Sequence, residues 1–325
     1  MRTTSTLLAA TALTAAGGVA ATAETWDLPL AYPATNFHSV NAAEFGECVT
    51  EATDGGIDIV THPNGSLFAG NDIKRAVQTG QAPIGERLMS AHQNENPMFG
   101  VDSIPFLATS FEDHERLWDA AGPAVAEILD AQNLVYLYSV AWPPQGLYFK
   151  REIHEVGDMD GIRFRSYNTA TARLAELTNM RPVQIEAAEL SQALATGVAE
   201  SFISSGATGY DSQVWESLTH FYEVDAWLPR NIIFVNKQAW EALDDDTRAA
   251  MRDCADTARE AGLQRSIDYT NFTLDGLREG GMNVERASDA LMDGLREIGD
   301  IMTEEWLENA GDTGREVIEA YRASN

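Results

Sequence analysis

The sequence predicts an α/β protein of two lobes, with a ligand cleft between them and long helices in the C-terminal part. Short strand-like runs alternate with longer helical patterns, which favours α/β domains with largely parallel sheets. Two Pro-containing interruptions, at 142–146 and 228–230, are typical of crossings between domains. If both link the same two lobes, each lobe is discontinuous in sequence. The length also suits two ordinary domains, because about 300 residues follow the first 23.

The individual elements follow from apolar periodicity and from turn residues. Apolar and β-branched side chains gather in short runs that predict strands at 26–30, 57–61, 134–140, 161–166 and 231–236. A helical pattern over 41–52 ends at Asp54-Gly55-Gly56, and a second over 72–78 ends at Gly80. The chain after Asp244-Asp245-Asp246-Thr247 is mostly helical, and acidic groups at that start favour a helix N-terminus.

The first 23 residues have the pattern of a secretory signal. Arg2 precedes a run of small and apolar residues that ends in Ala21-Thr22-Ala23, a small-x-small cleavage pattern. A membrane anchor is the alternative, but the run is rich in small residues and no stop-transfer charges follow it. No later segment reaches the roughly 18 consecutive apolar residues that a membrane span needs. We therefore expect export, cleavage near Ala23 and a periplasmic location.

The composition is strongly acidic, with 50 Asp and Glu residues against 22 Lys and Arg and a net charge of −28. Such a surface repels nucleic acid and anionic lipid. It also repels an anionic ligand at long range, so a site for an anion needs its own local cation.

The chain has two cysteines, Cys48 and Cys254. Export permits a disulfide, and two cysteines allow a single connectivity. The separation of their Cα atoms decides whether the bond forms, and the sequence does not give that separation. The pairing therefore stays open at this point.

Motifs of enzymes and metal sites are missing from the sequence. It has no Cys-x-x-Cys, no His-Glu-x-x-His, no phosphate-binding Gly-x-x-x-x-Gly-Lys and no Gly-x-Ser-x-Gly. The six histidines are scattered and no two lie at i, i+4, which disfavours a local zinc site. Catalytic triads are assembled in space, so this argues only weakly against catalysis. We expect no cofactor and no metal.

Arg165 is the strongest single candidate for a binding residue. It alternates with the apolar Ile162 and Phe164 in a short predicted strand that follows Gly161. Arg163 and Arg165 share one face of that strand, where a solvated arginine is the ordinary outcome, since arginine is rarely buried. The functional alternative is that Arg165 points into a cleft, where its planar guanidinium grips a carboxylate with two parallel hydrogen bonds.

A series of short motifs resembles the extracytoplasmic solute-binding subunits of tripartite ATP-independent periplasmic (TRAP) transporters. Their order and spacing carry the resemblance, which extends from Trp26 to at least Ala258. The motifs are Pro63-Asn64-Gly65-Ser66-Leu67, Ala76-Val77-Gln78-Thr79-Gly80, Ser103-Ile104-Pro105-Phe106-Leu107, Asp160-Gly161-Ile162-Arg163-Phe164-Arg165, Glu189 with Gln192-Ala193-Leu194-Ala195-Thr196-Gly197-Val198, and Val235-Asn236-Lys237-Gln238-Ala239-Trp240.

The resemblance implies a periplasmic-binding-protein fold that closes on its ligand and then docks on membrane permease subunits. The signal pattern and the two crossings predict a signal peptide at 1–23, a first lobe of 24–145 plus about 231–272, and a second lobe of 146–230 plus about 273–325. Arg165 falls where the family keeps its carboxylate-gripping arginine. Asn168 falls at a position that often contacts the ligand.

The sequence departs from the sialic-acid type of this family at two positions. Tyr148 stands where that type has a second arginine, and Ser204 stands where it has a ligand-binding asparagine. The changes remove a cation and an amide, so a specificity for sialic acid is not implied.

Further site candidates come from their positions beside predicted strands and crossings, since ligands of α/β domains lie beyond strand C-termini. For each aromatic residue, ordinary core packing is an equally good interpretation, and for His38 a turn position is the better one. The candidates are Asn36, Phe37, His38, Glu86, Arg87, Trp142, Tyr148, Tyr167 and Trp215.

The resulting hypothesis is a receptor for a small monocarboxylate with an aliphatic or aromatic body. Arg165 anchors the carboxylate, hydrogen bonds come from Asn168, Ser204 and Tyr148, and Trp142, Tyr167 and Phe37 form apolar walls. A sugar acid or a dicarboxylate is the alternative ligand, and Arg87 is the residue that would favour the dicarboxylate. A ligand sensor and, less favoured, an exported enzyme are the alternative functions.

Overall fold

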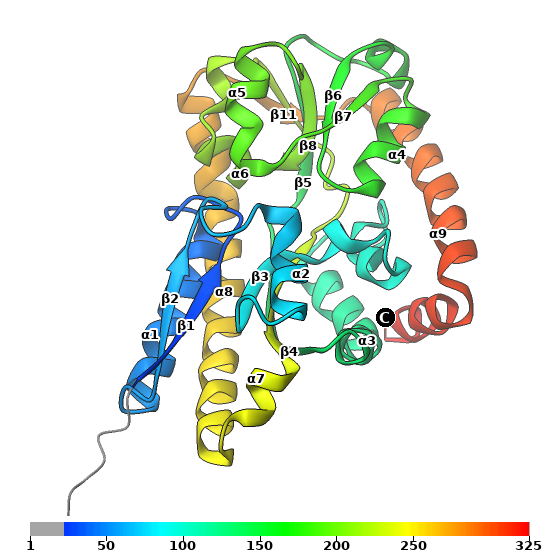
Figure 1. Cartoon of the computed structure of the whole chain (residues 1–325). Helices are drawn as coiled ribbons and strands as arrows, with labels where there is room; N and C mark the ends of the chain where they lie inside the picture. Colours follow the sequence, from blue (N-terminus) through cyan, green and yellow to red (C-terminus); the bar gives the residue numbers. More distant parts are fainter. Residues whose placement is uncertain (1–22, 325) are drawn as a thin grey trace, which may run out of the picture.

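The computed structural model describes residues 23–324 and has two lobes that lie one above the other in Figure 1. The signal peptide expected at 1–23 lies outside the described residues except for its last position. No helix within 23–324 has the length and apolar character to cross a membrane. The same part of the chain contains no group of three His, Cys, Asp or Glu side chains placed to hold a metal ion.

Lobe I, the lower lobe in Figure 1, is built on two small sheets. β1 and β2 pair in parallel, and β10 lies between β3 and β4, antiparallel to both. The strands are β1 (Glu24–Pro29), β2 (Ile57–His62), β3 (Ile84–Leu88), β4 (Leu134–Ala141) and β10 (Arg230–Asn236).

Lobe II, the upper lobe, is built on one six-stranded sheet in the order β11-β9-β5-β8-β6-β7. The strands β5 and β8 in its centre are fully buried. The strands are β5 (Gln145–Phe149), β6 (Arg163–Ser166), β7 (Arg181–Gln184), β8 (Ser201–Ser205), β9 (His220–Glu223) and β11 (Asn283–Arg286).

The helices cover the faces of these sheets, and most of the longer ones start at a side-chain cap. The capping oxygens accept a backbone N–H two or three residues further on, which satisfies one of the free donors of the first turn. The α-helices are α1 (Phe37–Ala52), α2 (Ile73–Gln78), α3 (Phe111–Ala131), α4 (Thr169–Leu177), α5 (Leu190–Ala195), α6 (Gly206–Asp211), α7 (Lys237–Ala242), α8 (Asp245–Glu279) and α9 (Asp289–Ala323). Short 3-10 turns are η1 (Gly70–Asp72), η2 (Met89–His92), η3 (Pro97–Ser103), η4 (Val156–Met159), η5 (Ala187–Glu189) and η6 (Val214–Glu216).

Two extended segments cross between the lobes side by side. One joins β4 to β5 and the other joins β9 to β10, at the two interruptions seen in the sequence. Backbone hydrogen bonds tie them together, from Trp142 N to Pro229 O (2.7 Å) and from Gln145 N to Trp227 O (3.0 Å). The two-lobed α/β prediction is confirmed, but the sheets are mixed rather than largely parallel. The crossing segments run in opposite directions, so the strands that continue them pair antiparallel.

Helix α8 is a third connection between the lobes, and it contacts α1 and β4 in lobe I and α6 and β11 in lobe II. In lobe I it approaches its neighbours closely. The Asn41 side-chain amide donates to Ala258 O (2.8 Å), and a Cβ on Gly262 would lie 2.5 Å from a Val140 methyl group. Cys48 on α1 and Cys254 on α8 form a disulfide, with Cα atoms 5.8 Å apart. This resolves the pairing that the sequence left open.

Helix α9 runs down one side of the molecule and reaches both lobes (Figure 1). It contacts α4 in lobe II and α3 in lobe I. Gly311, with φ 63° and ψ −143°, interrupts it and redirects its last turns toward α3. The sequence-based division assigns 273–325 to the second lobe, whereas the structure packs the end of this segment on the first.

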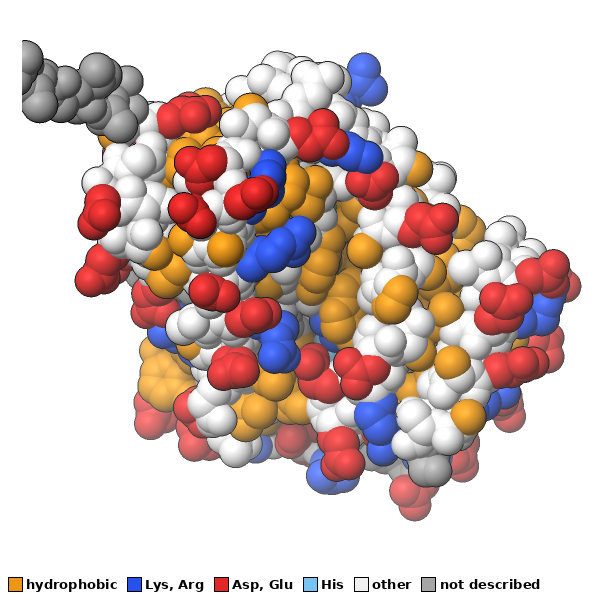
Figure 2. Space-filling model, turned by 90° about the horizontal axis from the view of Figure 1, so that it is seen from below, with side chains coloured by type: hydrophobic (Ala, Val, Ile, Leu, Met, Phe, Trp, Pro, Cys, Tyr) orange, Lys and Arg blue, Asp and Glu red, His pale blue; other side chains and the backbone are white. Residues whose placement is uncertain are grey.

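Acidic side chains are scattered over the face of the molecule seen from below (Figure 2), with fewer basic ones between them. This agrees with the net charge of −28. An anionic ligand therefore depends on buried cations rather than on the outer surface.

Candidate functional site

A cavity lies between the two lobes, next to the crossing segments. Both lobes and the crossings contribute to its lining. The lining residues are Tyr32, Arg87, Leu88, Trp142, Gln145, Arg165, Tyr167, Glu186, Ala187, Ser204, Thr208 and Pro229. Five of the candidates from the sequence line it together: Arg87, Trp142, Arg165, Tyr167 and Ser204.

Arg165 projects from β6 into this cavity and is 4% exposed. Its Nε donates to Ile185 O (2.9 Å), while Nη1 and Nη2 make no hydrogen bond to another described residue. Its guanidinium lies over the Tyr167 ring, 5.1 Å from the centroid. Burial lowers the pKa of Arg165 to about 10, so it stays charged at neutral pH. The solvated alternative for Arg165 does not hold, and its free amino groups are donors for a carboxylate.

A second arginine reaches the cavity from lobe I and meets an acid from lobe II. Arg87 Nη2 lies 3.2 Å from Glu186 Oε2 and also donates to Asn71 Oδ1 (2.7 Å). Arg87 comes from β3, and Glu186 follows the end of β7. Among the described residues, the charged groups of the lining are two arginines and one glutamate, which gives a net charge of +1. The site therefore matches the charge of a single carboxylate.

Aromatic rings form the apolar walls, and hydrogen bonds hold them in place. Trp142 donates to Asn231 Oδ1 (2.8 Å) and meets the Tyr32 ring edge-on, with centroids 4.9 Å apart. Tyr167 donates to Gln145 Oε1 (3.2 Å) and accepts from Trp227 Nε1 (3.2 Å). Burial raises the pKa of Tyr32 to about 12, so its phenol is neutral. Rigid walls of this kind suit a compact ligand body.

Two hydroxyl groups from lobe II complete the lining. Ser204 is the penultimate residue of β8, and Thr208 lies in α6. Ser204 Oγ donates to Thr208 Oγ1 (2.8 Å). Hydroxyls of this kind both donate and accept, so they can direct a polar ligand atom.

The structure places Tyr148 away from the cavity, which corrects the expectation of a hydrogen bond from it to the ligand. Tyr148 is fully buried in the core of lobe II and stacks on Phe202, with centroids 4.2 Å apart and planes 5° apart. Its hydroxyl donates to Ser205 O (2.8 Å) and fills the space that a side chain on Gly209 would occupy. Ring and hydroxyl are therefore both used for packing.

Asn168 also lies outside the cavity lining, but it makes a contact between the two lobes. Its side-chain oxygen accepts from Thr171 N and caps α4 (2.8 Å). Its amide group donates to Ser90 Oγ across the two lobes (2.9 Å). The structure therefore gives Asn168 a contact that holds the lobes together in place of a ligand contact.

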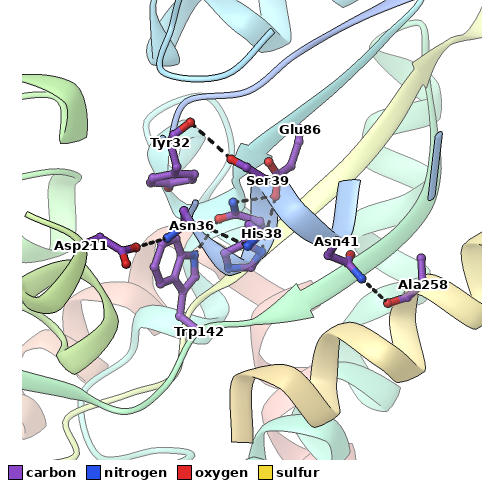
Figure 3. Close-up of polar contacts among 10 residues, drawn as sticks. Tyr32, Asn36, His38, Ser39, Asn41, Glu86, Trp142, Asp211 and Ala258 are labelled. Atoms are coloured by element: carbon purple, nitrogen blue, oxygen red, sulfur yellow. Dashed lines mark hydrogen bonds and ion pairs between the residues drawn. The ribbon is translucent and has the colours of Figure 1, made fainter. Parts of the chain in front are cut away.

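Phe37, His38 and Glu86 form a buried layer behind Trp142, as Figure 3 shows for the latter two. The rings of Phe37 and His38 lie 5.1 and 4.4 Å from Trp142. Glu86 accepts from Asn231 Nδ2 (3.0 Å), and Asn231 in turn holds the Trp142 indole. These residues support the cavity wall and do not line it. They were candidates for ligand contact because they lie close to a predicted strand in the sequence, but the structure places them behind the wall.

Two further candidates from the sequence have other positions. Asn36 caps α1 and reaches across to lobe II, where its amide donates to Asp211 Oδ2 (2.7 Å; Figure 3). Trp215 packs on Gly280 beyond the end of α8. The contact of Asn36 with Asp211 joins the lobes as the contacts of Asn168 and Arg87 do. Together these three contacts hold the lobes in a closed arrangement around the cavity.

Glu86 makes the stability of the protein depend on pH. Burial raises its pKa from 4.5 to about 7, and burial lowers the pKa of the neighbouring His38, whose Nδ1 lies 3.4 Å from Glu86 Oε1. The folded state therefore holds the Glu86 proton more tightly than the unfolded state. The resulting stabilisation is complete below pH 4.5 and is lost as the pH rises through 7.

We expect Glu86→Gln to gain stability relative to the wild type as the pH rises. The amide keeps an acceptor for Asn231 and does not ionise. The gain should be near zero at pH 4.5 and about 1–3 kcal/mol at pH 8. Urea unfolding of both proteins at the two pH values measures it. A difference that does not change with pH would show that Glu86 is not a buried titrating group.

Several lining residues were missed by the sequence analysis: Tyr32, Leu88, Gln145, Glu186, Ala187, Thr208 and Pro229. Some carried a positional signal. Tyr32 follows β1 and Glu186 follows β7, both beyond the end of a parallel strand. Gln145 and Pro229 belong to the two crossings that the sequence did mark.

Comparison with known proteins assigns the family. The bacterial extracellular solute-binding proteins of family 7 match residues 31–309. A TRAP solute-binding protein from a marine metagenome, described as specific for pyroglutamate and crystallised with it, is 52% identical, with a TM-score of 0.92 over 93% of this chain and 99% of that one. DctP6 of Bordetella pertussis, described as binding pyroglutamic acid, is 42% identical, with a TM-score of 0.91 over 92% of this chain and 100% of that one. DctP7 of the same organism, with the same description, is 37% identical, with a TM-score of 0.91 over 92% and 100% of the two chains. The chain belongs to the bacterial extracellular solute-binding proteins of family 7, the solute-binding receptors of TRAP transporters.

Proposed function

We propose that this protein captures pyroglutamate, or a closely similar small cyclic monocarboxylate, in the cavity between its lobes. The observation that carries the proposal is the charged lining: a free guanidinium on Arg165 beside an arginine that is already paired with Glu186. One carboxylate neutralises this site and a second does not. The similarity to three receptors described as binding pyroglutamate supports the same class of ligand.

In this proposal the carboxylate lies on Arg165. The two terminal amino groups of a guanidinium match the two oxygens of a carboxylate, and the low dielectric of a buried site strengthens the bonds. The Tyr167 ring lies 5.1 Å from the guanidinium and stabilises its positive charge. Arg165 thus replaces the hydration shell that the anion loses on entry.

The ring of the ligand lies against the aromatic walls. Trp142, Tyr32 and Tyr167 offer flat apolar surfaces, and Ser204 and Thr208 offer hydroxyls nearby. A five-membered lactam has a short apolar edge and an amide edge, so both kinds of surface are used. An aromatic acid, which the sequence analysis allowed, would use the walls but leave the polar groups without partners.

Ligand contact with both lobes favours closure, because the closed form has contacts that the open form lacks. Arg87 with Glu186 and Asn36 with Asp211 are such contacts in this protein itself. We propose that the closed, loaded receptor works in the periplasm after removal of residues 1–23. It then delivers the ligand to TRAP membrane subunits, and it does not transform the ligand.

Isothermal titration calorimetry of the mature protein tests the proposed ligand. L-pyroglutamate should bind one-to-one, and it should bind at least tenfold more tightly than benzoate, glucuronate or succinate. At a concentration about 100 times its Kd it should add about 2.7 kcal/mol to the free energy of unfolding. Mass spectrometry of the recovered ligand should show it unchanged. Tightest binding by a sugar acid or a diacid would contradict the proposed ligand.

A further inference from the structure

We infer that the Arg87–Glu186 ion pair is the specificity-determining element of the site: it accepts the uncharged amide edge of a lactam acid and rejects a second carboxylate. This inference deepens the proposed function and rests on it. It also names Glu186 as the residue that makes this cavity selective for monocarboxylates.

The pair is built across the two lobes and is well shielded. The Arg87 side chain is 4% exposed and that of Glu186 is 24% exposed. Arg87 Nη2 contacts Glu186 Oε2 and Asn71 Oδ1, at 3.2 and 2.7 Å. Both Arg87 and Glu186 line the cavity that contains Arg165. A ligand held on Arg165 therefore faces this pair.

The ion pair changes the charge that a ligand meets in the cavity. Glu186 neutralises Arg87 inside the protein, so Arg87 has no free charge for a ligand. A diacid held on Arg165 would bring its second carboxylate next to Glu186, where two negative charges repel each other in a poorly solvated space. Replacing Glu186 with its amide removes that repulsion and frees the charge of Arg87.

The ion pair also offers both hydrogen-bond donors and acceptors to a ligand. A lactam has its N–H and its carbonyl oxygen side by side. The ion pair has the complementary edge, with guanidinium N–H groups beside carboxylate oxygens. Among the described residues, Arg87 donates its hydrogen bonds through Nη2, so its Nη1 is a donor left over. An uncharged donor–acceptor edge therefore suits this wall better than a carboxylate does.

Gly70 provides the room for the pair. A Cβ at this position would lie 2.8 Å from Glu186 Oε2, 3.0 Å from Arg87 Nη1 and 3.1 Å from Arg87 Cζ. Gly70 begins η1 in lobe I, so it lies under the contact between the lobes. Gly70→Ala should push the pair apart without changing any charge, and it separates the effect of pair geometry from that of charge.

The experiment compares L-pyroglutamate and glutarate, a five-carbon diacid, by calorimetry on the mature protein. Glu186→Gln should weaken pyroglutamate binding about tenfold and strengthen glutarate binding about tenfold or more. Gly70→Ala should weaken pyroglutamate binding without a gain for glutarate. Glu189→Gln is the matched control: it removes one negative charge from an exposed position three residues away and should change neither affinity.

The outcomes separate the inference from the proposed function. If wild type binds pyroglutamate and Glu186→Gln keeps the wild-type preference between the two ligands, the inference is overturned. If Glu189→Gln gains as much glutarate affinity as Glu186→Gln, general charge and not the pair sets specificity, and the inference fails as well. If wild type does not bind pyroglutamate but Glu186→Gln gains glutarate, the proposed ligand is wrong and the role of Glu186 in excluding diacids stands. Circular dichroism of each variant confirms that it is folded.

Discussion

Replacing Arg165 with alanine should weaken binding of the carboxylate ligand about 30-fold or more while leaving the protein folded. Loss of one partner from a buried charge pair costs about 2–5 kcal/mol in binding. Arg165 is buried, and its one hydrogen bond to another described residue is made through Nε. The rest of its guanidinium is therefore free for the ligand. Calorimetry of the mature variant with L-pyroglutamate measures the loss.

Arg163→Ala is the matched control for this experiment. Arg163 lies on the same strand, two residues earlier, and is exposed, with its guanidinium 2.7 Å from Glu200. Its loss should change affinity by less than about twofold, since exposed ion pairs contribute little. Arg165→Lys should recover only part of the affinity, because an ammonium group does not match a carboxylate with two parallel bonds. Less than a threefold loss in Arg165→Ala would remove Arg165 from the site.

Removing the disulfide should lower the free energy of unfolding by about 3–5 kcal/mol. Cys48 and Cys254 are 206 residues apart in sequence. The bond therefore closes a long loop and reduces the entropy of the unfolded chain strongly. It joins α1 to α8 within lobe I. Guanidinium unfolding of Cys48→Ser with Cys254→Ser, against the oxidised wild type, measures the effect.

The ligand affinity of the double serine variant should stay close to that of the wild type at 25 °C. Neither cysteine lines the cavity, and the lobes are also joined by two extended crossings. A large loss of affinity in a folded variant would show that the disulfide positions the site. An unchanged free energy of unfolding would show that the bond contributes nothing to stability.

The sequence predicted the architecture because its signals are local. The two Pro-containing interruptions lie where the chain does cross between the lobes, and the helix start at Asp244 is an observed cap, with its carboxylate 2.7 Å from Thr247 N. The order and spacing of the short motifs predicted the family, which the family match confirms. Arg165 stood out because an arginine in an apolar strand needs a partner.

The rest of the site depends on contacts between residues far apart in sequence. Tyr148 and Arg165 both lie in buried strands of one sheet, but Tyr148 faces the core of lobe II and Arg165 faces the cavity. Tyr148 turns to the core because its ring packs on Phe202 and its hydroxyl fills the space beside Gly209. The periodicity of a single strand does not reveal these contacts. Glu186 was overlooked because its role depends on Arg87, 99 residues earlier.

The buried arginines of the cavity explain how an acidic receptor takes up an anion. A net charge of −28 opposes the approach of a carboxylate. The cavity overcomes this locally, with two buried arginines of which one is neutralised in place. In the proposed model, selectivity follows from the difference of one charge, since the residues in 23–324 that line the cavity supply one unpaired cation and not two.

A crystal structure of the mature protein with L-pyroglutamate tests the central claim most directly, namely that Arg165 holds the carboxylate of a small monoanion between the lobes. We predict both carboxylate oxygens within hydrogen-bond distance of Arg165 Nη1 and Nη2, with the lactam edge toward the Arg87–Glu186 pair. A carboxylate bound to Arg87 with the Glu186 contact broken, or a ligand outside this cavity, would contradict the account.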